Sequence, residues 1–335
     1  MSSAYASQQT PGYLNHLKNI AVFGANGTIG SHIVSELLEK NIFNITAITR
    51  AESKGMFEDG VNKEYVDYSN TDTIIAALKG KDALIITMAV TAAKDTQAKL
   101  IRAAATAGVP WVLPNEFGMY NTDEAQNDTI GDSKTKDRAL LQSLGLSYIG
   151  VTCGFWYEHS LSAPDLYDFD IAKREGILFD DGAQKINTST RKQTGSAVAA
   201  ILSLPLLPKD ENDKSLTLNS YRNRMAFVAS FALSQRDMLD SLQRVTNTSD
   251  SDWNISRVPA KERFAEAKQE IGKGNRAAFG RALYTRYFYD DAGLFEKTHG
   301  LDNEKLRLLK ADLDEATKVA IGLQESGYWD NYGKN

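Results

Sequence analysis

Residues 20–30 read Ile-Ala-Val-Phe-Gly-Ala-Asn-Gly-Thr-Ile-Gly, and this stretch decides the fold. The apolar run at 20–23 predicts a buried strand, and the apolar spacing over 29–38 predicts a helix. Glycines between the two elements allow a tight turn and let a pyrophosphate approach the helix N-terminus, where free N–H groups favour an anion. In this strand–turn–helix context the glycines indicate a dinucleotide-binding loop, with a plain tight turn as the alternative. The loop residues expected to bind the cofactor are Gly24, Asn26, Gly27, Thr28, Ile29 and Gly30.

Short apolar runs alternate with helical patterns as far as about residue 150, which predicts βαβ units and a parallel sheet. The fold class is therefore α/β, a doubly wound parallel Rossmann sheet with a smaller C-terminal α+β substrate lobe. We expect a polar N-terminal leader over 1–17, an NAD(P)-binding Rossmann domain over 18–153 and a mixed substrate lobe over 154–335. Some segments of that lobe are expected to return to the sheet. Further expected strands are 45–48, 63–66, 83–86, 111–113 and 148–151, and further expected helices are 71–78, 96–107 and one ending at 144.

Three patterns stand out in the second half of the chain. A helix is expected over 195–202, ending before Pro205. Residues 234–237, Ser-Gln-Arg-Asp, resemble a capping box that starts another helix. Apolar residues with helical spacing from Leu306 to Leu323 predict one amphipathic helix whose stripe packs into the core.

Composition excludes several classes of protein. The 335 residues contain 38 Lys and Arg against 43 Asp and Glu, a net charge of −5, and no basic block, so we expect no nucleic-acid partner. The longest apolar run, 83–93, is too short to cross a bilayer, and no signal peptide is evident, so we expect a cytoplasmic protein without membrane contact. One cysteine and four scattered histidines indicate no metal site. The chain is expected to be a monomer or a homodimer.

The end of the second strand indicates which dinucleotide binds. An NAD site usually carries an Asp or Glu there, which bonds the ribose 2′-hydroxyl. Here the strand ends in Arg50, with Lys54 nearby, and cations suit a 2′-phosphate. The sequence therefore favours NADPH over NADH, the alternative being that Arg50 is a solvated loop charge.

One catalytic pattern of short-chain dehydrogenases is incomplete in this chain. That pattern is Tyr-x-x-x-Lys, and the helix starting near residue 133 has Lys134 but Ile130 at the tyrosine position. An amine beside a bound cationic ring, or buried against apolar walls, has a lowered pKa and becomes useful for proton transfer. Lys134 is therefore the candidate catalytic residue, and a solvated lysine at a helix start is the alternative.

Several motifs together resemble the NmrA-like and isoflavone reductase-like atypical short-chain dehydrogenases, in a fungal branch of that family. They are the glycine loop, Arg50, residues 114–118 (Pro-Asn-Glu-Phe-Gly) and Lys134, which lies eleven residues before Gly145 as in the family. Asn115 replaces the family serine. The resemblance covers about residues 18–205 well. It implies that Lys134 holds the nicotinamide ribose and acts as a general acid or base.

The substrate should lie at the carboxyl ends of the strands, above the nicotinamide. Met88, Asn115 and Phe117 are expected to line the cofactor there. The remaining residues at these ends are mostly apolar or aromatic, which suits a small aromatic or polyketide-like ligand, although core packing is the alternative for each. The expected pocket residues are Val90, Met119, Tyr120, Phe155, Trp156, Tyr157 and His159, with Tyr284, Tyr287, Phe288 and Tyr289 closing it from the second lobe.

Three functions remain open at this point. The first is an NADPH-dependent reductase of a small aromatic, enone, imine or benzylic-ether-like secondary metabolite. The second is a non-catalytic, NADP(H)-binding redox sensor that acts on a partner protein, as NmrA-like proteins can. The third is a redox-neutral isomerase or cyclase that keeps the cofactor pocket as a scaffold.

Overall fold

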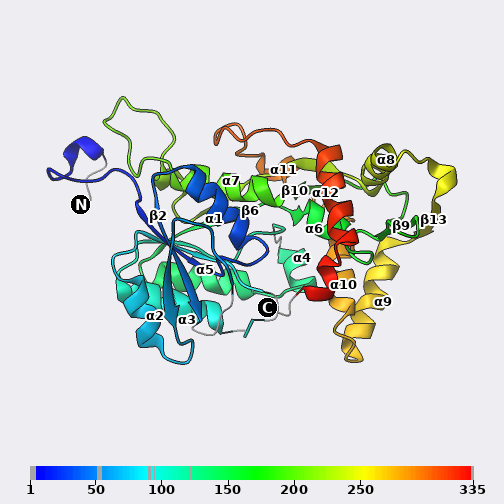
Figure 1. The fold of residues 1–335 in the computed structure, drawn as a ribbon, viewed down its shortest axis with the longest axis horizontal. Coiled ribbons are helices and arrows are strands. Elements are labelled where there is room, and N and C mark those ends of the chain that lie inside the picture. The colour runs from blue at the N-terminus through cyan, green and yellow to red at the C-terminus, as the bar shows by residue number, and fades with distance from the viewer. Residues whose placement is uncertain (1–4, 51–54, 90–91, 94, 121–122, 333–335) are drawn as a thin grey trace.

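A parallel sheet forms the centre of the first lobe (Figure 1). The computed structural model describes residues 5–50, 55–89, 92–93, 95–120 and 123–332. In the described residues the sheet has seven strands in the order β11-β6-β5-β4-β1-β2-β3, and every adjacent pair is parallel. The strands are β1 (Asn19–Phe23), β2 (Asn44–Arg50), β3 (Val61–Val66), β4 (Ala83–Ile86), β5 (Trp111–Leu113), β6 (Ser147–Thr152) and β11 (Arg224–Phe227).

Helices cover both faces of this sheet, which confirms the doubly wound fold. Helices α1 (Gly30–Glu39) and α7 (Arg191–Leu202) share an apolar core with one face of the sheet. Helices α2 (Thr71–Leu78), α3 (Thr96–Ala107) and α5 (Ser133–Ser143) share a second core with the other face. The strand order reverses between β1 and β4, and ligands of such sheets bind at the carboxyl ends of the strands at this point.

The second lobe contains two small sheets and most of the remaining helices, around a separate aromatic-rich core (Figure 1). Its strands are β7 (Phe155–Trp156), β8 (Phe169–Asp170), β9 (Glu175–Phe179), β10 (Ile186–Ser189), β12 (Phe231–Leu233) and β13 (Asn254–Val258). The other helices of the chain are α4 (Asp123–Asp128), α6 (Tyr157–Leu161), α8 (Gln235–Thr246), α9 (Ala260–Gly272), α10 (Ala278–Tyr287), α11 (Glu296–His299), α12 (Leu313–Glu325) and α13 (Tyr328–Asn331). Short 3-10 helices are η1 (Ala6–Gln8), η2 (Leu218–Tyr221) and η3 (Asp250–Asp252).

Helix boundaries in this half of the chain differ in two places from those predicted. Helix α7 begins at Arg191 rather than at residue 195, because the Thr190 side chain accepts the N–H of Gln193 and caps the extra turn. The long helix predicted from residue 306 was wrong in its first part: α12 begins at Leu313, and Leu309 is 89% exposed. The capping box at 234–237 is confirmed at the start of α8.

A glycine at the end of β1 allows the chain to turn sharply into α1. Gly24 has a φ of +80°, a conformation that residues with a side chain rarely adopt. A Cβ atom there would also collide with the carbonyl oxygen of Thr87. The Thr87 hydroxyl donates to the carbonyl oxygens of Phe23 at 2.9 Å and Gly24 at 3.0 Å, so the turn is held from the end of β4.

We predict that Gly24→Ala lowers the free energy of unfolding by about 2–4 kcal/mol, since it adds a backbone collision to left-handed strain. Gly108→Ala is the matched control, because Gly108 has a φ of +78° and open space around the missing side chain. It should cost only about 1 kcal/mol. Equal losses in urea denaturation would contradict the importance of the Thr87 contact.

Candidate active site

The glycine loop forms a narrow turn at the start of α1. The N–H of Gly27 donates to the carbonyl oxygen of Gly24 at 2.9 Å, and a Cβ atom at Gly30 would collide with that same oxygen. Backbone therefore lies directly against backbone. The loop already forms the first turn that leads into α1, since the Ser31 N–H donates to the Gly27 carbonyl oxygen at 3.0 Å, and the positive end of the helix dipole lies at this turn. This arrangement fits the pyrophosphate of a dinucleotide.

Two polar side chains lie toward β2: Asn26, in the glycine loop, and Arg50, at the end of the strand. Arg50 is exposed at the end of β2, with its guanidinium carbon 5.9 Å from the centre of the Tyr68 ring. The Asn26 amide packs against the backbone at Gly55, where a Cβ atom would collide with it. Strand β2 contains no carboxylate, so a cation is the charged group that it presents at this edge. Lys54 lies outside the described residues.

Asn115 joins the carboxyl ends of β4 and β5. Its side-chain oxygen accepts the N–H of Met88 at 3.3 Å, and its amide nitrogen lies 3.4 Å from the Met88 carbonyl oxygen. The backbone N–H of Asn115 donates to the side chain of Gln97 at 2.8 Å. Phe117, two residues further, is buried in the core beneath. Two of the expected cofactor residues, Met88 and Asn115, are thus bonded to each other.

Lys134 lies in the first turn of α5 and faces a buried carboxylate. Its Nζ is 3.5 Å from Glu116 Oε2, and Arg138, one turn along α5, is 2.6 Å from Glu116 Oε1. The Glu116 side chain is 3% exposed and that of Lys134 only 18%, so the alternative of a solvated lysine does not fit. One carboxylate therefore balances two cations, and a negatively polarised ligand atom can still approach Lys134.

The thiol of Cys153, in the loop after β6, lies within the electrostatic influence of Lys134. Burial raises the pKa of Cys153 to about 11, while hydrogen bonds and the Lys134 charge oppose this rise. The thiol stays protonated near neutral pH and is a poor nucleophile. Of these two neighbouring side chains, Lys134 rather than Cys153 is therefore the candidate catalytic residue.

Three of the expected pocket residues lie in the aromatic-rich core of the second lobe. Phe155 stacks on Tyr284 at a ring distance of 3.8 Å, and Tyr157 is fully buried with its hydroxyl 2.7 Å from the Thr317 hydroxyl. Met119 is buried in the same core. Tyr287 and Phe288, expected to close the pocket, are buried there too. Val90 lies outside the described residues.

His159 instead faces a C-terminal aromatic segment, which comprises Tyr328, Trp329 and Tyr332, while Trp156 packs against the core of the first lobe with its ring 5.6 Å from that of His159. His159 Nδ1 is 3.0 Å from the Tyr328 hydroxyl, and the rings of Trp329 and Tyr332 lie 4.5 and 5.0 Å from the imidazole. The Tyr332 hydroxyl lies close enough to the Thr28 side chain in the glycine loop for Thr28 to oppose the rise that burial causes in the pKa of Tyr332. Residues from the far end of the chain therefore border the cofactor site.

The sequence analysis missed this segment, although its density of aromatic residues was a usable signal. In Figure 1 the red helix α12, which precedes this segment, lies on the side of the second lobe that faces the first. Tyr120 belongs to a separate cluster, with its ring 5.1 Å from Phe227 and 4.7 Å from His299. The structure thus divides the expected pocket residues among three places.

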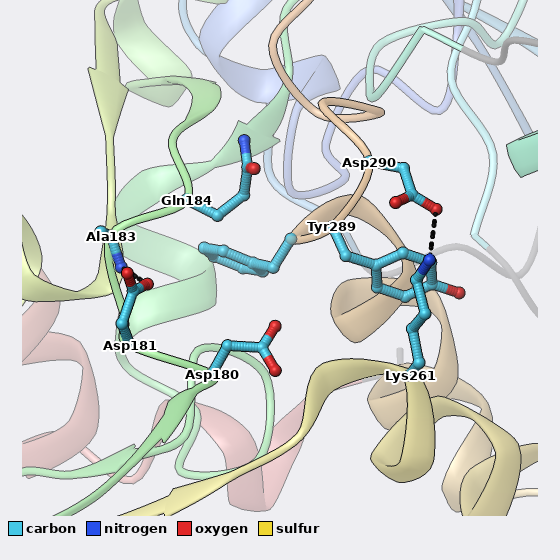
Figure 2. A pocket seen from close by; sticks show the side chains of 8 residues that line it. Asp180, Asp181, Ala183, Gln184, Lys261, Tyr289 and Asp290 are labelled. Carbon is cyan, nitrogen blue, oxygen red and sulfur yellow. Dashed lines mark hydrogen bonds and ion pairs between the residues drawn. The ribbon is translucent and has the colours of Figure 1, made fainter.

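Hollows on the surface of the second lobe are poor candidates for the site. The one drawn in Figure 2 has a volume of about 440 Å³ and is lined by three carboxylates, and Lys261 at its edge pairs with Asp290 at 3.1 Å. It contains no residue of the glycine loop. In the described part of the chain, no three His, Cys, Asp or Glu side chains are placed to hold a metal ion. Nor does any helix in that part have the length and apolar character needed to cross a membrane.

A doubly wound parallel sheet with a glycine turn at its switch point defines a Rossmann-type dinucleotide-binding fold. The model of the NmrA-like family matches residues 16–203, and the chain belongs to this family.

The chain is similar over most of its length to an oxidoreductase in sequence and to several solved structures in fold. Oxidoreductase aprR of Aspergillus flavus is 28% identical over 275 residues, which are 80% of this chain and 86% of the relative. The structure published for pinoresinol-lariciresinol and phenylcoumaran benzylic ether reductases has a TM-score of 0.71 at 17% identity, and the match covers 92% of this chain and 99% of that one. The Escherichia coli quinone oxidoreductase QOR2 in complex with NADPH has a TM-score of 0.65 at 19% identity, with 89% and 98% covered. These structures share the fold.

Burial of His159 makes the stability of the protein depend on pH. Burial, with the Arg191 charge as a smaller cause, lowers the pKa of His159 from 6.5 to about 3. Between these values the unfolded chain binds a proton that the folded chain does not, so the free energy of unfolding falls as pH falls.

We predict that His159→Gln removes about 2 kcal/mol of the stability difference between pH 7 and pH 5. Urea denaturation at the two pH values measures this difference. His16→Gln, at an exposed position, is the control and should leave the difference as in the wild type. A wild-type pH dependence in His159→Gln would contradict the neutral, buried imidazole.

Proposed function

We propose that this chain is an NADPH-dependent reductase of a small aromatic, enone, imine or benzylic-ether-like metabolite, with Lys134 handling the proton. The observation that carries the proposal is the half-buried Lys134 ammonium, held by Glu116 at the same sheet edge as the glycine loop. Relatives named oxidoreductases and a structural neighbour solved with NADP⁺ and (+)pinoresinol support it.

The residues at the switch point fit NADPH. The loop from Gly24 to Gly30 offers backbone N–H groups to the pyrophosphate, with Asn26, Thr28 and Ile29 around it, and Arg50 offers a cation to the 2′-phosphate. Asn115 fixes the Met88 backbone where the nicotinamide end would lie. The cofactor would supply a hydride. The protein positions the reactants and stabilises the developing charge.

Lys134 can supply the proton that a reduction of this kind requires. When hydride adds to a polarised double bond or opens a benzylic ether, negative charge collects on an oxygen or nitrogen of the substrate. An ammonium hydrogen bonds that atom, stabilises the charge and can transfer a proton from Nζ. Glu116 keeps the Lys134 side chain in place, with Nζ 3.5 Å from Oε2.

We predict that Arg50→Ala weakens NADPH binding about tenfold to a hundredfold, because it removes charge-assisted hydrogen bonds to the 2′-phosphate. NADH binding should change by less than about twofold, since NADH lacks that phosphate. Titration followed by nicotinamide fluorescence gives both dissociation constants. An equal loss for both dinucleotides would show that Arg50 does not bind the 2′-phosphate.

We predict that Lys134→Ala leaves NADPH consumption at least about a hundredfold slower, because general acid catalysis typically contributes that much. The assay follows the loss of nicotinamide absorbance with a panel of quinones, enones and benzylic ethers. Lys136→Ala is the matched control, since Lys136 is exposed on the same helix and pairs only with Asp132 at 3.0 Å in the described structure. Turnover in Lys134→Ala equal to that of the wild type would remove Lys134 from the mechanism.

The same assay separates the three functions. Consumption of NADPH with any acceptor supports the reductase. The absence of Tyr from position 130 is the observation that favours a redox sensor, which would bind NADPH tightly without consuming it and capture a partner protein only with cofactor present. Conversion of a substrate without loss of NADPH would indicate an isomerase or cyclase.

A further inference from the structure

Arg191 is a buried cation without an acidic partner. The residue is 9% exposed, and among the described residues no carboxylate lies within ion-pair distance of its guanidinium and nothing hydrogen-bonds its Nε. The carboxylate of Glu158 accepts the backbone N–H of Arg191 at 3.2 Å and forms no ion pair with the guanidinium; burial raises the pKa of Glu158, and the Arg191 charge opposes this rise without cancelling it. Burial of an unpaired charge is costly, so this arginine calls for an anion.

The other titratable groups near Arg191 do not supply one. Burial lowers the pKa of His159 to about 3 and that of His32 to about 4, and the Arg191 charge lowers both further. Both imidazoles are therefore neutral at pH 7. The ring of Tyr328 lies 6.0 Å from the guanidinium carbon, and burial raises the pKa of Tyr332, so that its hydroxyl is neutral as well.

The direction of the helices places Arg191 at the same edge of the sheet as the glycine loop. Helix α7 leads into β11 and α1 leads into β2, and both strands run parallel within one sheet. Both helices therefore run against the strands and begin at the carboxyl edge. They touch where Gly195 meets the His32 backbone, and Arg191 lies one turn before Gly195.

Tyr332 connects the two parts of this edge. The Thr28 side chain in the glycine loop and the Arg191 charge both oppose the rise that burial causes in the pKa of Tyr332, so its hydroxyl lies near both groups. The Tyr328 ring lies over the guanidinium, 6.0 Å from its carbon, and Arg191 itself is only 9% exposed, so this charge has little contact with water. Charge interactions are stronger where water is excluded.

We propose that Arg191 is a cofactor-binding residue whose guanidinium contacts the pyrophosphate oxygens of a dinucleotide at the glycine loop. The inference rests on the proposed function. A guanidinium presents N–H groups in a planar fork that matches phosphate oxygens, and the N-terminus of α1 favours the same anion. Arg191 thus contributes from α7 a charge that the glycine loop itself lacks.

The test compares Arg191→Gln with Lys192→Gln, at the exposed neighbour in the same helical turn. NADPH binding, followed by nicotinamide fluorescence, should weaken about tenfold to a hundredfold in Arg191→Gln and change by less than about twofold in the control. Arg191→Lys should fall between the two, because it keeps the charge and loses the fork. Unchanged affinity in both Arg191 variants would overturn the proposal.

Two fragments of NADPH test whether Arg191 contacts the pyrophosphate. The loss in Arg191→Gln should also be seen with 2′-phospho-ADP-ribose, which retains the pyrophosphate, and should be absent with 2′-AMP, which does not. An equal loss with 2′-AMP would overturn the assignment to the pyrophosphate. If the wild type binds no dinucleotide, the proposed function itself fails, whereas wild-type binding with unaffected Arg191 variants contradicts only this inference.

Thermal unfolding separates binding from a structural role. Without ligand, Arg191→Gln should unfold at the wild-type temperature or above it, because it removes an unpaired buried charge. Added NADPH should raise its unfolding temperature less than that of the wild type. A lower unfolding temperature without ligand, together with wild-type affinity for NADPH, would assign Arg191 a structural role instead.

Discussion

The close packing of α7 on α1 is the contact on which the rest of the site depends. It requires glycine at position 195, since a Cβ atom there would collide with the backbone carbonyl of His32. With the two helices in contact, the chain that returns from the second lobe enters the first lobe at the carboxyl edge of the sheet. The glycine loop, the end of β6 and the start of α7 are therefore neighbours, although they are far apart in sequence.

The cations at the carboxyl edge of the sheet differ in whether a carboxylate pairs with them. At the end of β5, Glu116 balances both Lys134 and Arg138, so one ammonium is held in place and still available to a ligand. At the start of α7, Arg191 has no such carboxylate among the described residues. A dinucleotide between these places would find fixed cations at both ends, and it would need little rearrangement of the protein to be held.

Composition alone predicted an aromatic environment but not which aromatic side chains lie near the glycine loop. An apolar, aromatic environment at the strand ends was expected, and the second lobe is rich in aromatic rings, most of them packed edge to face. Several of the residues chosen from sequence, among them Phe155 and Tyr157, instead pack inside that lobe. The rings found near the start of α7 and the glycine loop are instead those of Tyr328, over Arg191, and Tyr332, near Thr28, at the other end of the chain.

The sequence by itself determined the parallel sheet, the glycine turn and the cation at the end of β2. Each of these depends on local periodicity or on residue types within one βαβ unit. The start of α7 was also readable in principle, because Thr190 and Gln193 are spaced as a helix cap. The partners of Lys134, the lack of an ion pair at Arg191 among the described residues and the place of the C-terminal aromatic segment emerge from the three-dimensional packing alone. These depend on contacts between residues distant in the chain, and such contacts follow from the packing of whole helices rather than from any local pattern.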